Sequence, residues 1–153
     1  MGFHYAAPNL VRICVDQRSA YDISGRMYHC YCRDAFPFQS AGELMMEMDR
    51  FFDALDFPQA AVVSRSFHAR QIKRLDRNAD KCRRVEEMEQ YKGDIATFVV
   101  HVQYRQNATW QGEVIWTDEQ RKSSFRSVLE LIKLMDNAMD SAEGRQDADR
   151  AEC

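Results

Sequence analysis

The feature that most constrains this chain is a repeat with an offset of 87 residues. When residues 11–53 are placed on residues 98–140, ten of the 43 aligned positions are identical and no gap is needed. The identical pairs are Val15/Val102, Arg18/Arg105, Gly25/Gly112, Phe38/Phe125, Ser40/Ser127, Glu43/Glu130, Leu44/Leu131, Met48/Met135, Asp49/Asp136 and Asp53/Asp140. A repeat of this length predicts two copies of one supersecondary unit that bury a shared apolar face.

Each copy has the pattern of two strands followed by a helix. Apolar residues alternate with polar ones over 98–105 and 110–116, and the same alternation occurs over 11–15 and 23–29. Ser40 and Ser127 each precede a glutamate by three residues, which is the capping-box signal for a helix start. We therefore predict an α+β fold over residues 1–140. Internally duplicated β-β-α units, 11–55 and 98–140, form one mainly antiparallel sheet with two helices on one face.

The segment between the copies, 56–97, has a different composition. Residues 60–67 are β-prone and predict one extra strand, whereas 68–91 are polar and favour a linker or helix. Residues 141–153 are small and charged, so we expect a disordered tail.

The charge balance and the cysteine pattern narrow the class of protein. With 21 basic and 24 acidic residues the net charge is −3, which gives no global reason to expect nucleic acid or an anionic membrane. No apolar run approaches the roughly 20 residues that span a bilayer. Five irregularly spaced cysteines make a poor disulfide framework, so we expect a reducing, cytoplasmic environment.

No recognisable catalytic or metal-binding motif occurs in the sequence. Cys30 and Cys32 would point to one side of a strand and His29 to the other, which favours free thiols over a metal site even with Cys14 or His101 nearby. The repeated aspartates at 49, 53, 136 and 140 fit a solvated helix face. We therefore expect no enzyme activity, no metal and no cofactor.

The sheet face opposite the helices is the candidate functional surface. It would be too apolar for a face in water, which is the composition of a protein interface. Its expected members are Cys14, Tyr28, Cys30, Val99, His101 and Ile115. We predict a non-catalytic binding or regulatory module that forms a homodimer or docks a partner protein here. A small-ligand site is a second alternative.

The first alternative is RNA or single-stranded nucleic-acid binding. Residues 65–84 contain eight basic and two acidic side chains, and three glutamates follow immediately. The basic residues suited to contact phosphates are Lys73, Arg74, Arg77, Arg83 and Arg84, with Phe67 or His68 placed to stack on a base.

The second copy, with Thr109-Trp-Gln-Gly and Phe125-Arg-Ser-x-Leu-Glu-Leu-Ile, resembles a family of small proteins of clostridia and related Firmicutes. The resemblance extends loosely over nearly the whole chain and is closest at 98–139. It implies a bacterial, cytosolic protein and supplies no activity, so no site residue follows from it.

Overall fold

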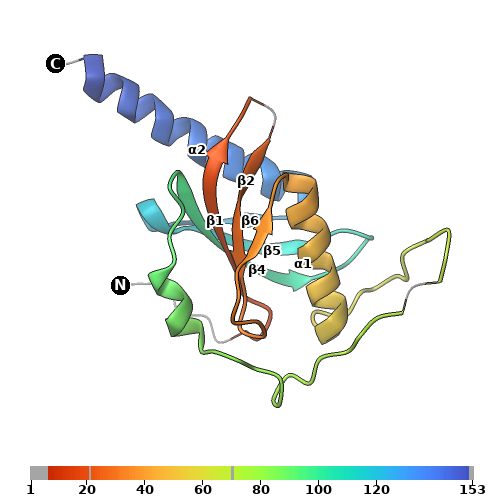
Figure 1. The fold of residues 1–153 in the computed structure, drawn as a ribbon. Helices are drawn as coiled ribbons and strands as arrows, with labels where there is room; N and C mark the ends of the chain where they lie inside the picture. The colour runs from red at the N-terminus through yellow and green to blue at the C-terminus, as the bar shows by residue number, and fades with distance from the viewer. Residues whose placement is uncertain (1–6, 21, 70, 152–153) are drawn as a thin grey trace.

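The computed structural model describes residues 7–20, 22–69 and 71–151, with side chains as far as Ser141. Six antiparallel strands form one sheet in the order β3-β2-β1-β4-β5-β6 (Figure 1). Two helices pack on one face of this sheet, which confirms the predicted α+β class. The elements are β1 (Val11–Arg18), β2 (Ile23–Tyr28), β3 (Phe36–Phe38), α1 (Ala41–Leu55), η1 (Val85–Gln90), β4 (Ala96–Tyr104), β5 (Gln111–Trp116), η2 (Thr117–Glu119), β6 (Arg121–Phe125) and α2 (Val128–Ala151).

The two halves of the chain follow the same order of three strands and one helix. β1 and β4 pair at the centre of the sheet. From this pair outward, the first half continues with β2 and β3, and the second half continues in the same way with β5 and β6. The register shifts after Val15 in β1 and after Val102 in β4, at positions 87 residues apart. This arrangement is what a duplicated unit would produce, and the duplication itself stays a prediction.

The matched glycines lie opposite these two irregularities. A Cβ atom added to Gly25 would stand 1.9 Å from the carbonyl oxygen of Cys14, and one added to Gly112 would stand 2.1 Å from that of His101. The neighbouring strand pairs each glycine with a buried phenylalanine, Phe38 or Phe125. A glycine is required here because the adjacent backbone approaches too closely for any side chain.

Both helices begin with the predicted capping box. Ser40 Oγ accepts from the backbone N–H of Glu43 at 3.1 Å, and the Glu43 carboxylate accepts from the N–H of Gln39 at 3.0 Å. Ser127 and Glu130 repeat both contacts at 3.1 and 2.9 Å. These reciprocal bonds satisfy helix donors that have no partner within the helix. The buried helix side chains shared by the core are Leu44, Met48, Phe52, Leu55, Leu131, Met135 and Met139.

One arginine from each half also forms ion pairs with the helix of the other half. The contacts join guanidinium nitrogens to carboxylate oxygens: Arg18–Asp136 (2.7 Å), Arg18–Asp140 (2.7 Å), Arg105–Asp53 (2.6 Å) and Arg105–Asp49 (3.7 Å). All six residues occupy matched positions of the repeat. The four aspartates are therefore not merely a solvated helix face, as the sequence suggests, because they bind the helices to the sheet.

Several predicted boundaries differ from the structure. Strands β3 and β6 were not expected, so each unit is β-β-β-α. Residues 60–67 form no strand and contribute one isolated bridge, between Ala60 and Arg105. Residues 71–91 form no long helix: they contain a turn at 77–80, closed by bonds to Asp76 and Asp80, and the short 3-10 helix η1. Other bonds of this stretch go to α1 and to the loop after β2. Residues 141–151, expected to be disordered, continue α2; residues 152–153 lie outside the described part.

The long connection from α1 to β4 runs around one end of the sheet (Figure 1). It is held by backbone bonds from Ala61 to Arg105, from Leu75 to Ala54, and from Cys82 and Arg83 to the carbonyl of Cys30. Within the described ranges, no helix has the length and apolar character needed to cross a membrane.

Candidate functional site

The last part of the connection folds over half of the sheet face that the helices leave open. Figure 1 shows η1 and α1 on opposite sides of the sheet. The Tyr91 ring stacks on Tyr28 of β2, with ring centroids 4.0 Å apart and an interplanar angle of 6°. Arg12 Nε donates to the Tyr91 carbonyl at 2.7 Å, and Arg26 donates to the Lys92 carbonyl at 2.8 Å. Residues 82–95, which we call the cover segment, therefore pack on β1 and β2.

A groove lies where the cover segment ends and β4 and β5 continue. Its volume is about 470 Å³. Val99 and Ile115 are direct cross-strand neighbours on this face and form the apolar floor. Two basic and two acidic residues, together with apolar side chains of η1, complete the lining: Arg12, Lys92, Glu89, Asp118, Val85 and Met88. The charges around the groove are therefore balanced in sign.

Three of the six predicted interface residues are covered by the chain itself, and a fourth, Ile115, is only 5% exposed although it lines the groove. Cys14 and Cys30 are fully buried, and Tyr28 is covered by Tyr91. Burial raises the pKa of the Cys14 thiol and also that of Cys30, so both side chains stay protonated near neutral pH. The sequence prediction is corrected here because it assumed a bare sheet face, whereas the cover segment occupies this half.

The other three predicted residues lie together on the open half. Val99 and Ile115 line the groove, and half-buried His101 pairs across the strands with Glu113. Burial lowers the pKa of His101, against the opposing effect of the Glu113 charge. His101 is thus held mainly as the neutral imidazole at pH 7, next to an ion pair between Glu113 and Lys122 at 3.5 Å.

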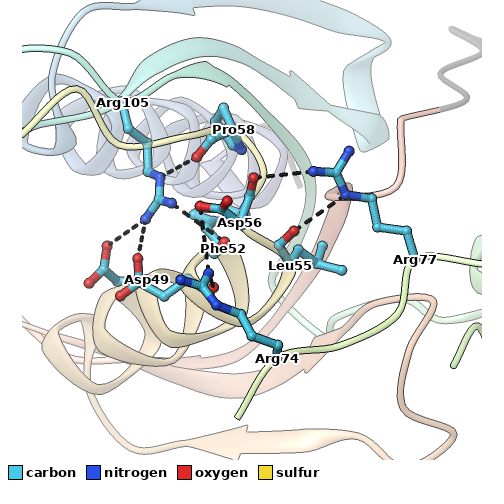
Figure 2. Close-up of polar contacts among 9 residues, drawn as sticks. Asp49, Phe52, Leu55, Asp56, Pro58, Arg74, Arg77 and Arg105 are labelled. Carbon is cyan, nitrogen blue, oxygen red and sulfur yellow. Dashed lines mark hydrogen bonds and ion pairs between the residues drawn. The ribbon is translucent and has the colours of Figure 1, made fainter. Parts of the chain in front are cut away.

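Two arginines of the predicted nucleic-acid segment bind the end of α1. Arg74 Nη1 donates to the carbonyl of Asp53 at 2.6 Å, and Arg77 donates to the carbonyls of Leu55 and Asp56, each at 3.3 Å (Figure 2). The last turn of α1 contains no basic residue of its own. Cations supplied by the connection therefore satisfy its free carbonyls and complement the helix dipole.

Arg83 is also used by the fold. Its side chain is buried, and its guanidinium donates to the Cys32 carbonyl at 2.6 Å and to the Arg33 carbonyl. The same group lies 5.5 Å from the centre of the Tyr91 ring. Of the five predicted phosphate contacts, Lys73 and Arg84 are exposed, and within the described residues their side chains bond to no backbone carbonyl. Phe67 is fully exposed nearby in sequence.

Sequence reasoning missed the contribution of the cover segment to the groove. The sequence places Leu75, Ala79, Cys82, Val85 and Met88 at helix-like spacing, and Tyr91 follows three residues after Met88. In the structure, Val85, Met88 and Tyr91 pack against the sheet, through a short 3-10 helix that ends before Tyr91. The spacing therefore indicates that these side chains are buried, but it does not show that they pack on the sheet face of β1 and β2.

Comparison with protein-family models, with curated proteins and with solved structures finds no match. Among the described residues, no group of three or more histidine, cysteine or acidic side chains is arranged to hold a metal ion.

Proposed function

We propose that this protein is a non-catalytic binding module that associates with a second copy of itself through the open half of the sheet face. The observation that carries the proposal is the groove above Val99 and Ile115, which the cover segment borders without filling. The β1–β2 half of the face is covered by the chain itself. A second copy placed against the β4–β5–β6 half would complete the burial of this face in both molecules.

The charges favour a second copy over a strongly charged partner. Arg12 and Lys92 face the same groove as Glu89 and Asp118, and Lys122 pairs with Glu113 on the neighbouring strands. In a two-fold interface each patch meets its own copy, so a surface with both signs is self-complementary. A nucleic acid would meet carboxylates as well as cations at this groove, which opposes phosphate binding.

Analytical ultracentrifugation of matched variants tests the proposal. Val99→Glu introduces a carboxylate into the groove floor, while Leu129→Glu makes the same kind of change on α2, where the side chain is 60% exposed. We expect a dimer for the wild type and for Leu129→Glu, and a monomer for Val99→Glu. Lys92→Glu reverses a charge on an exposed side chain at the border of the groove and should weaken the dimer about tenfold. Because Lys92 is exposed, this variant tests the interface without disturbing the folded core. A wild-type monomer at all concentrations would contradict self-association.

RNA or single-stranded nucleic-acid binding is the competing proposal. The exposed Phe67 side chain and the exposed cations Lys73 and Arg84 support it. The double variant Lys73→Glu/Arg84→Glu would abolish binding of a single-stranded oligonucleotide and leave the dimer intact. Retention of a small molecule in the groove by the purified protein would instead favour the small-ligand alternative.

A further inference from the structure

The two edges of the sheet differ in their readiness to accept another strand. β3 has three residues with Pro37 in the middle, and proline protects an edge because it has no N–H to donate. β6 has five residues without proline, and its first four are exposed. Every second residue of an edge strand directs its backbone N–H and C=O away from the sheet. β6 therefore lacks the protection that Pro37 gives to β3, and it is the edge at which a partner strand could pair.

A hollow of about 210 Å³ lies beside β6 on the helix-covered face. Strands β4 and β5 contribute Phe98, Val114 and Trp116 to its wall, and Arg121 to Ser123 of β6 border it. The second to fourth turns of α2 complete the lining with Leu134, Asn137, Ala138 and Ser141. A strand added along β6 would direct alternate side chains toward this hollow, because side chains alternate between the two faces of a sheet.

Trp116 supplies a second, independent observation at the same place. Its side chain is 8% exposed, and its indole Nε1 is buried without a hydrogen-bond acceptor among the described residues. A buried donor without a partner is costly, and such groups are rare in folded proteins. Arg121 is the direct cross-strand neighbour of Trp116. An N–H donor next to a guanidinium suits a carboxylate, which accepts hydrogen bonds and carries the opposite charge.

In the other half, the equivalent cavity is lined in part by the connection between α1 and β4. A cavity of about 320 Å³ lies between β3 and α1, with Met27, His29 and Phe51 at positions 87 residues before Val114, Trp116 and Ala138. Leu75 of the connection also lines this cavity. His29 Nδ1 already accepts from the Tyr31 N–H at 3.1 Å. The contrast between the halves therefore singles out β6 as the receptive edge.

We propose that β6 and the hollow beneath α2 bind an extended, acidic segment of a partner protein by strand addition. Main-chain bonds to β6 align the segment. One glutamate side chain enters the hollow, accepts from Trp116 Nε1–H and pairs with Arg121. This site is separate from the groove of the proposed dimer, because Val99 and Ile115 lie on the opposite face of the sheet.

Nuclear magnetic resonance of the ¹⁵N-labelled full-length chain tests this site with a defined probe. The probe is the capped peptide Thr-Val-Glu-Val-Glu-Val-Thr, and its control carries glutamine in place of both glutamates. We expect the acidic peptide to shift the Trp116 indole N–H resonance and to protect β6 amides from hydrogen exchange. The glutamine peptide should bind at least tenfold more weakly.

Single-residue variants measure the separate contributions of Arg121 and Trp116 to peptide binding. Arg121→Glu changes an exposed side chain and should weaken the acidic peptide about tenfold or more. Trp116→Phe keeps an aromatic ring but removes the indole donor together with part of the ring volume, and it should weaken the acidic peptide about fivefold. Lys73→Glu, the same charge reversal at an exposed position of the connection, should leave binding unchanged. Val99→Glu should also leave peptide binding unchanged. The strand-addition proposal can therefore be tested whether or not the protein forms a dimer through the groove.

Three results would overturn the proposal. The first is no change at Trp116 or in β6 with 1 mM acidic peptide. The second is equal binding of the glutamine peptide or insensitivity to Arg121→Glu. The third is concentration-dependent broadening of β6 resonances without peptide, which would show that a second copy of this chain occupies the edge.

Discussion

Arg105 illustrates how one residue can connect both halves of this fold. Its side chain is 6% exposed, and it donates to the Pro58 carbonyl at 2.7 Å and to the Phe52 carbonyl at 3.5 Å, besides its ion pair with Asp53 (Figure 2). Arg18 has the matched position and binds two aspartates of α2 that are about 60% exposed. Solvent screens the Arg18 contacts far more than those of Arg105.

We therefore expect unequal effects from the same substitution at these two positions. Arg105→Met should lower the free energy of unfolding by about 3 kcal/mol, because it leaves the buried Pro58 carbonyl and the Asp53 carboxylate without this donor. Arg18→Met should cost about 1 kcal/mol or less. Urea denaturation of both variants measures the difference. Equal losses would contradict the role assigned to Arg105.

The protonation of His29 makes the stability of the fold depend on pH. Its ring packs on Phe51 at 3.9 Å, and burial, with the Arg83 charge, lowers its pKa from 6.5 to about 4. The charged side chains that line the adjacent cavity are Asp34, Glu47 and Arg50. Because the unfolded chain takes up this proton below pH 6.5 and the folded chain does so only near pH 4, stability is lost as pH falls through this interval.

The expected loss from His29 is about 2 kcal/mol between pH 7.5 and pH 5. His29→Asn keeps an acceptor for the Tyr31 N–H and does not titrate. The difference in unfolding free energy between wild type and variant should therefore change by this amount across the interval. A difference that is independent of pH would show that His29 is protonated equally in both states.

At the scale of elements, the matched glycines determine whether the hairpins can close. Gly112→Ala should cost about 2–3 kcal/mol, because its Cβ would meet the backbone of β4 rather than a movable side chain. Gly42 on the first turn of α1 is the control, since a Cβ there meets only Ser40 Oγ at 3.9 Å. Gly42→Ala should stabilise the protein by about 0.5–1 kcal/mol. Thermal unfolding of the two variants should thus shift in opposite directions.

The elements that could be predicted were those with a strong local pattern. Alternation and capping boxes located both hairpins and both helix starts. β3 and β6 were not predicted because neither has an alternating apolar pattern. β3 has only three residues, one of them a proline, and β6 begins with the polar stretch Arg121-Lys-Ser-Ser. Their pairing with β2 and β5 instead follows from Phe38 and Phe125, which fill the space beside the glycines.

The candidate site was harder to predict because it depends on contacts distant in sequence. Tyr28 stacks on Tyr91, and Arg12 bonds to the same residue, across 63 and 79 positions. The basic residues Arg74, Arg77 and Arg83 were assigned to phosphate from their density, although each bonds to backbone carbonyls. Charge density alone does not distinguish a surface for a ligand from cations that complete a helix end.

At the scale of the whole molecule, the sheet has two different faces and two different edges. One face carries both helices, and the other is half covered by residues 82–95. The strand order is symmetric, while the cover segment and Pro37 make the first half closed and leave the second half open. The proposed groove lies between the cover segment and the face of this second half, and the proposed hollow lies at its edge.

The central claim is that the open face joins two copies of the chain. Native mass spectrometry of gently purified protein tests it most directly, because it reports both the number of chains and any bound species. We predict a bare dimer at twice the chain mass of 17.9 kDa, and a monomer for Val99→Glu. A wild-type monomer, or added mass from a nucleotide, an oligonucleotide or a small ligand, would contradict the account.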